Sequence, residues 1–278
     1  PLKTEIVCEG FTLKIEGRAD GLIHTKEQVM VDEIKGVLRE LDRVQEPVGI
    51  HLAQAKCYAS MVAEQEGVDE IGVQMTYCQM ETEEVKRFQY SYQKNELKVW
   101  FDEVIRQYEK WAKFQIEWRK ARNASIKGIE FPFPYRKGQR ELAVSVYRTI
   151  LRKKKLFIQA PTGVGKTIST VFPAVKAVGE ELGEKIFYLT AKTITRTVAE
   201  QAFETLREQN LKFKVITLTA KEKICFCEET SCNPDDCPYA KGHFDRVNDA
   251  VYELLMQEDV MSREVLEAQA RKHKVCPF

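Results

Sequence analysis

The amino-acid sequence predicts an α/β protein that contains two different kinds of unit. Residues 5–35 and 71–92 alternate β-branched and polar residues, which is typical of strands with one buried face. After residue 138, helical patterns alternate with short apolar runs, which indicates a parallel sheet covered by helices. A Pro- and Gly-rich stretch, residues 128–139, separates the two patterns and marks a boundary between units.

The composition limits the class of protein. The chain has 278 residues, of which 44% are hydrophobic and 31% are charged, an ordinary globular composition. No run approaches the roughly 20 apolar residues of a membrane span, and the N-terminus shows no secretory signal pattern. We therefore expect a cytoplasmic protein with no membrane partner. Because the chain lacks an initiator Met and ends abruptly, we also expect a fragment cut at both ends.

Charge gives a weaker indication. The net charge of +1 says nothing about nucleic acid. Residues 152–155 are four consecutive cations, and residues 110–127 form a basic helical stretch. A solvated helix face explains each of these clusters as well as a binding surface does.

The first part of the chain follows a mixed order of elements. After the strands of residues 5–35 we expect a helix at 48–66, paired strands at 71–80 and 85–92, and a long helix at 95–122. The long helix carries Trp and other aromatic residues at helical spacing, which favours packing in a core or between domains.

The second part of the chain alternates regularly between helices and strands. We expect helix 138–153, strand 155–160, helix 166–179, strand 185–190, helix 194–208 and strand 213–218.

A Gly-rich turn lies between strand 155–160 and helix 166–179. Its sequence, Ala160-x4-Gly165-Lys166-Thr167, is a P-loop with Ala in place of the first Gly. Backbone N–H groups of such a turn bind phosphate, the Lys reaches the β- and γ-phosphates, and the Thr holds Mg²⁺. We predict that ATP is bound by Thr162, Gly163, Val164, Gly165, Lys166 and Thr167.

Two neighbouring segments resemble those of superfamily-2 helicases. "PFPYRKGQRELA" resembles the segment that contacts adenine, with Gln139 in the base-reading position. "IFYLTAKTITR" resembles the strand and loop that grip the DNA backbone. The candidate phosphate contacts in it are Thr190, Lys192, Thr193 and Arg196. General loop polarity is the alternative explanation of both segments.

Five of the eight cysteines follow residue 224. Clustered thiols beside a nucleotide-binding loop favour a metal over disulfides. Thiolates suit iron–sulfur clusters and zinc alike, but the two Cys-x2-Cys pairs of a zinc ribbon do not occur. Cys225 and Cys227 are only two residues apart, and we expect only one of them to be a ligand.

The cysteines follow the third predicted strand, as in DinG- and XPD-type helicases. This resemblance covers residues 128–278 and implies a helical [4Fe–4S] insertion in a RecA-like motor. It implies the ligands Cys225, Cys232, Cys237 and Cys276, with Cys227 spare. It also implies ATP-driven 5′ to 3′ translocation on single-stranded or forked DNA, in repair or processing. No Asp-Glu-x-His motif follows the P-loop, which we attribute to truncation.

The first part of the chain contains a possible metal site. Asp20 precedes Glu33-x-Lys35, and two carboxylates can bind Mg²⁺ or Mn²⁺ while a lysine orients the nucleophile. The stretch resembles the RecB-like PD-(D/E)xK nucleases, a restriction-endonuclease-like α/β fold. That family carries Gln-x3-Tyr on the following helix, which Gln54 and Tyr58 supply one turn apart.

Together these patterns predict three domains: a nuclease at 1–125, the first part of a helicase motor at 126–224, and an iron–sulfur domain at 225–278. A non-catalytic DNA-binding platform on an ATPase is one alternative. A zinc-binding ATPase unrelated to DNA is another. The four histidines are isolated in the sequence, so we expect surface or capping roles for them.

Overall fold

The computed structural model describes residues 1–161, 163–191 and 193–278, without the side chains of 193–195. Within these residues the chain divides into two compact units, Pro1–Lys113 and Phe114–Phe278. In the described parts, no helix combines the length and the apolar character needed to cross a membrane.

The first unit contains a hairpin and a four-stranded sheet. In the hairpin, β1 (Leu2–Cys8) and β2 (Phe11–Gly17) pair antiparallel. The sheet has the order β3-β4-β5-β6, and its strands are β3 (Gly21–His24), β4 (Val29–Val37), β5 (Glu70–Gln79) and β6 (Val85–Gln93). The central pair, β4 and β5, is parallel, and both outer pairs are antiparallel. These strands confirm the predicted ones.

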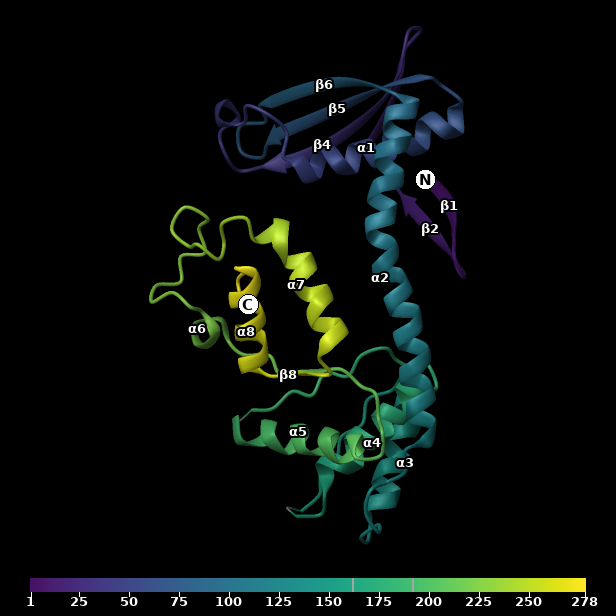
Figure 1. Ribbon diagram of the computed structural model, residues 1–278, viewed down its shortest axis with the longest axis vertical. Helices are drawn as coiled ribbons and strands as arrows, with labels where there is room; N and C mark the ends of the chain where they lie inside the picture. The colour runs from purple at the N-terminus through teal and green to yellow at the C-terminus, as the bar shows by residue number, and fades with distance from the viewer. Residues whose placement is uncertain (162, 192) are drawn as a thin grey trace. The chain divides into compact units, whose positions relative to one another are not determined.

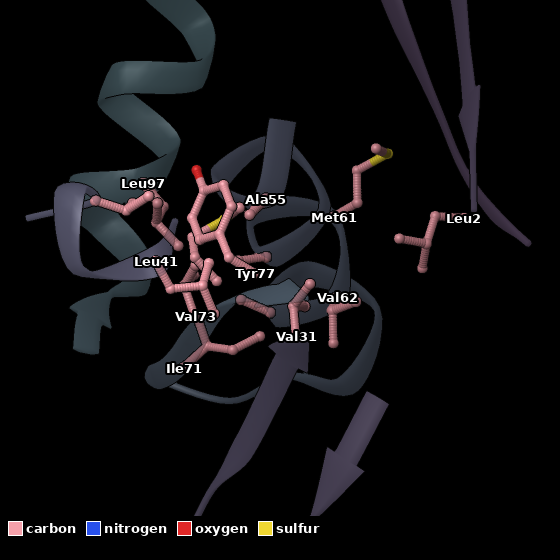
Figure 2. Close-up of a cluster of buried hydrophobic side chains, with 14 residues drawn as sticks. Leu2, Val31, Leu41, Ala55, Met61, Val62, Ile71, Val73, Tyr77 and Leu97 are labelled. Carbon is pink, nitrogen blue, oxygen red and sulfur yellow. The ribbon is translucent and has the colours of Figure 1, made fainter. Parts of the chain in front are cut away.

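A helix connects the two central strands and covers one face of the sheet. This helix, α1 (Gly49–Glu66), lies along β4, β5 and β6 in Figure 1 and confirms the predicted helix 48–66. A parallel pair requires such a crossover connection. Alternate residues of β5 point toward α1, and Figure 2 shows Ile71, Val73 and Tyr77 in the core with Ala55 and Val62.

The long helix α2 (Lys94–Gly128) continues across the boundary between the two units. Its first turns place Leu97 in the core of the first unit. Farther along, Lys214 Nζ lies 4.3 Å from the ring centre of Trp118, within the second unit. The helix extends six residues beyond the predicted end at 122. A short 3-10 helix, η1 (Leu41–Arg43), precedes α1.

Three helices follow one another in the second unit: α3 (Gln139–Leu151), α4 (Lys166–Gly179) and α5 (Thr193–Arg207). They confirm the three predicted helices to within two residues at each end. Buried side chains of α4 and α5, such as Val175 and Leu206, meet Ile126 from the end of α2. Gly179 has no room for a side chain, because an added Cβ would lie 2.4 Å from a methyl carbon of Ile126.

The predicted parallel sheet of the second unit is wrong for the residues that the structure describes. Segments 155–160 and 185–190 are neither helix nor strand and join no sheet, and they leave apolar side chains such as Phe157 93% exposed and Leu189 88% exposed. The predicted strand 213–218 is reduced to β7 (Val215–Ile216), which pairs parallel with β8 (Val260–Met261). Apolar runs indicate a capacity to form strands, but a strand also needs a partner with matching hydrogen bonds.

The end of the chain is helical. The elements are α6 (Lys221–Ile224), α7 (His243–Gln257) and α8 (Arg263–His273). Helices α7 and α8 enclose a small core of Ala250, Ala270 and Val275. The cysteine-rich segment, residues 225–242, runs between α6 and α7 as a series of turns.

Candidate functional site

Four of the five residues predicted for the first unit form one hydrogen-bonded network. Glu33 and Lys35 share the face of β4 that α1 covers, because side chains on a strand alternate. Lys35 Nζ donates to Glu33 Oε1 at 2.7 Å and to Gln54 Oε1 at 3.0 Å. Gln54 Nε2 donates in turn to the Tyr58 hydroxyl at 3.2 Å. The strand and the helix thus bring together residues 33, 35, 54 and 58.

The fifth predicted residue lies beside the same strand. Asp20 follows β2, and its Oδ2 accepts a hydrogen bond from the backbone N–H of Ile34 at 2.9 Å. This bond places the carboxylate of Asp20 next to the backbone that joins Glu33 to Lys35.

Glu33 is the most constrained member of the network. Its side chain is 2% exposed, and its second oxygen, Oε2, has no hydrogen-bond partner. A buried carboxylate oxygen without a partner is costly, and a hard divalent cation would satisfy it. Among the described residues, however, no three His, Cys, Asp or Glu side chains lie close enough together to hold a metal ion.

His51 lies beside this network, although its sequence position gave it only a surface or capping role. His51 lies on α1 together with Gln54 and Tyr58, and this helical spacing could have indicated that the three share a face. The hydroxyl of Tyr77, which is fully buried, accepts from the backbone N–H of Val48 at 2.9 Å and lies 3.1 Å from His51 Nδ1. The hydroxyl proton is satisfied only if it is donated to Nδ1. His51 is then neutral and carries its proton on Nε2.

The electrostatic surroundings favour the same neutral state. Burial lowers the pKa of His51, and the positive charges of Lys35 and Arg39 lower it further.

The P-loop of the second unit adopts the backbone that its glycines permit. Gly163 and Gly165 have φ angles of 80° and 73°, in the left-handed region, and α4 begins at Lys166. Lys166 Nζ donates to the backbone oxygens of Ala160 at 2.7 Å and Pro161 at 3.0 Å. Thr162, which was predicted to bind ATP, lies outside the described residues.

Gln139 fastens the start of α3 to the P-loop. Its side chain is 5% exposed, donates to the Val164 oxygen at 2.8 Å and accepts from the backbone N–H of Arg136 at 2.7 Å. Arg136 Nη1 also donates to the Gly163 oxygen at 2.6 Å. Glycine suits position 165, because its φ of 73° is strained for other residues and an added Cβ would lie 2.3 Å from Gln139 Nε2.

A cavity of about 420 Å³ opens beside this contact. Gln139 and Leu142 of α3 line it, together with Ile158, Pro161 and Val164. Its volume is in the range of small-molecule sites.

The remaining predicted contacts of the second unit are only partly described. Thr167 Oγ1 lies 3.4 Å from the Tyr188 hydroxyl. Arg196 Nε lies 3.5 Å from Glu200 Oε1. Lys192 and the side chain of Thr193 lie outside the described residues.

The cysteines of the second unit gather in two overlapping groups. In one group, the thiols of Cys227 and Cys237 form a hydrogen bond, with their sulfurs 3.7 Å apart. This hydrogen bond raises the pKa of Cys227 to about 11, and Cys225 acts in the same direction. In the other, a hydrogen bond to Cys232 raises the pKa of Lys221, and Cys276 and Cys225 act in the same direction.

The pKa of Cys237 is shifted in the opposite direction from that of Cys227. Burial tends to raise the pKa of its thiol, but N–H groups of Ala240 and Tyr239 and the thiol of Cys227 lower it overall. The predicted ligands Cys225, Cys232, Cys237 and Cys276 therefore lie in one region of the chain. The predicted spare thiol, Cys227, lies among them.

Comparison with known proteins identifies part of the second unit. Residues 140–227 match the DEAD/DEAH box helicase family model. The chain is 31% identical over 121 residues to a probable ATP-dependent helicase of Methanocaldococcus jannaschii, a match that covers 43% of this chain and 18% of that protein. The chain thus spans less than a fifth of the length of this relative. No solved structure matches. The second unit therefore contains a helicase-type domain.

The tautomer of His51 is directly testable. We expect ¹⁵N NMR to show a protonated Nε2 and an unprotonated Nδ1, with a titration midpoint below the ordinary value of about 6.5. Tyr77→Phe removes the hydroxyl that donates to Nδ1, so the two tautomers should mix. Tyr90→Phe, on the edge strand β6, is the control and should leave the signals unchanged. A protonated Nδ1 in the unaltered chain would contradict the assignment.

Proposed function

We propose that the second unit is the ATP-binding part of a DNA helicase motor. The observation that carries this proposal is the bonding of Gln139 to the P-loop, which lies within residues 140–227, the segment that matches the DEAD/DEAH box helicase family model. Translocation from 5′ to 3′ and action on single-stranded or forked DNA belong to the same proposal. They rest on the resemblance to DinG- and XPD-type helicases.

The residues of this unit have separate tasks. The N–H groups at the start of α4 receive the phosphates, where the helix dipole favours negative charge. Lys166 exchanges its bonds to the Ala160 and Pro161 oxygens for bonds to the β- and γ-phosphates. Gln139 binds the base from the side of the cavity. Thr167 would hold Mg²⁺, which neutralises phosphate charge when bound.

Nucleotide binding by Lys166→Ala tests the proposal. Hydrogen bonds to charged groups contribute about 1.5–3 kcal/mol, so we expect the Kd for a fluorescent ATP analogue to rise by about 10- to 100-fold. Lys185→Ala removes an exposed cation outside the P-loop and should leave the Kd unchanged. Equal affinities for Lys166→Ala and the unaltered chain would refute this role of the P-loop.

We further propose that the first unit is a metal-dependent DNA nuclease. The buried oxygen of Glu33 that has no partner supports this proposal. Burying a carboxylate oxygen costs free energy unless it has a partner, and a bound cation would be that partner. Glu33 and Asp20 would hold Mg²⁺ or Mn²⁺, which lowers the pKa of bound water when present. Lys35, held by Gln54, orients the attacking water, and Tyr58 fixes Gln54.

Single-stranded DNA cleavage in Mn²⁺ distinguishes this proposal from a non-catalytic DNA-binding platform. Loss of a residue that supports a metal ligand typically lowers metal affinity or activity by about 10–100-fold. Glu33→Gln removes a ligand itself, so the cleavage rate should fall by at least about 100-fold. Glu16→Gln, an exposed carboxylate paired with Lys3 on the hairpin, is the matched control and should cleave normally. If the unaltered chain binds DNA and does not cleave it, the platform interpretation holds instead.

The third proposal concerns a [4Fe–4S] cluster held by Cys225, Cys232, Cys237 and Cys276. Soft thiolates fit such a cluster chemically, and Cys225 belongs to both groups of neighbouring cysteines. For that reason we retain Cys225 in the ligand set, although Cys227 also lies beside Cys237. The role proposed for this region is to guide or separate the DNA strands.

Elemental analysis of the anaerobically purified chain tests the cluster. We expect iron and acid-labile sulfide in the unaltered chain and in Cys227→Ser, and their loss in Cys276→Ser. The reverse pattern would exchange the roles of these two residues. Zinc without iron would instead support a zinc-binding ATPase.

A further inference from the structure

Positive charge is concentrated in one part of the second unit. The chain as a whole has a net charge of +1, yet no Asp or Glu occurs between Glu141 and Glu180. The same stretch contains seven cations: Arg148, Arg152, Lys153, Lys154, Lys155, Lys166 and Lys176. Lys166 belongs to the P-loop, and Lys176 Nζ donates to the backbone oxygen of Ile126. The other five lie together in the sequence and have no such task.

These five cations lie at the end of α3, four of them on a turn with a fixed backbone. Lys153 has a φ of 52°, in the left-handed region. The backbone N–H groups of Arg152, Lys153 and Lys154 donate to oxygens in the last turn of α3 at 3.0, 2.9 and 3.0 Å. Residues 152–155, named here the basic turn, therefore present four consecutive cations, of which the first three have hydrogen-bonded backbone N–H groups.

The cations of the basic turn and Arg148 are exposed and unmatched. None of the five makes an ion pair in the parts of the chain that the structure describes. Exposed cations elsewhere, such as Lys14 and Lys98, have carboxylate partners at 3.0 Å. Neighbouring like charges repel one another and destabilise the compact state, so a polyanion would relieve a standing cost.

The basic turn lies at the opposite end of α3 from the residue that contacts the P-loop, although Leu156, the residue after the turn, lines the cavity of about 420 Å³. Gln139, which contacts the P-loop, is the first residue of α3, and Leu151 is the last. Twelve steps of 1.5 Å along a helix separate these two ends by about 18 Å. The unmatched charge is therefore not part of the ATP-binding loop.

We propose that the basic turn and Arg148 bind the phosphate backbone of nucleic acid at a contact separate from the P-loop. Lys and Arg bind phosphate oxygens without reading the base sequence. A membrane surface fits less well, since α3 is amphipathic but packs its apolar side against α4, with Ala143 and Ile168 buried. This contact goes beyond the proposed activities, because it needs neither ATP nor a divalent cation.

Salt-dependent DNA binding tests the proposal on the full chain. Anisotropy of a labelled single-stranded oligonucleotide is measured in EDTA, without nucleotide, from about 50 to 200 mM salt. The basic-turn variant replaces residues 152–155 with Gln. Each phosphate contact on a single strand contributes about 0.7 to the magnitude of the slope of log K against log salt. The slope of this variant should therefore be smaller in magnitude by about 2 to 3. A variant with Lys153, Lys154 and Lys155 replaced by Arg should keep the slope of the unaltered chain.

A charge-matched variant is the control. Lys3, Lys14, Lys98 and Arg263 each pair with a carboxylate, and their replacement by Gln gives the same change in net charge. This variant should keep the original slope. Equal slopes for both Gln variants, or no binding by the unaltered chain at low salt, would overturn the proposal. The proposal would also be overturned if the basic-turn variant lost binding to phosphatidylserine-containing vesicles but kept its binding to DNA. That result would indicate a membrane surface.

Discussion

The hydrogen bonds of Gln139 are the constraint on which the second unit depends. One side chain, almost fully buried, accepts from the backbone of Arg136 and donates to the backbone of Val164. It therefore joins the segment before α3 to the P-loop before α4. Because an unpaired buried amide is costly, neither segment can move without breaking a bond that holds the other. Glycine suits position 165, since its φ of 73° lies in the left-handed region and the amide of Gln139 occupies the space of a side chain there.

The first unit uses a similar principle with charged groups. Lys35 and Glu33 are paired beneath α1, and Gln54 and Tyr58 complete the arrangement. A buried ion pair is weak evidence for stability, because desolvation offsets much of the attraction. The carboxylate oxygen of Glu33 that has no partner is the atom for which we propose a cation. In both units these polar groups lie on elements that packing has fixed.

The sequence predicted the helices well and the sheet of the second unit poorly. Helix 166–179 follows from a local apolar period and from Gly at both ends, and the structure confirms it. Segments 155–160 and 185–190 have the composition of strands, but pairing depends on distant residues that a local pattern does not specify. The assignment of Glu33, Lys35, Gln54 and Tyr58 to one site rested on the resemblance to RecB-like nucleases together with strand and helix periods, and the structure brings the four residues together. His51 lay on the same helical face, but its link to Tyr77 is a long-range contact that spacing alone does not show.

A structure of the chain with a non-hydrolysable ATP analogue and Mg²⁺ tests the central claim most directly. The account predicts phosphates on the N–H groups that begin α4, with Lys166 turned from the oxygens of Ala160 and Pro161 toward them. It predicts the base beside Gln139, in the cavity between α3 and the P-loop. A nucleotide bound elsewhere, with Lys166 still bonded to those two oxygens, would contradict the account.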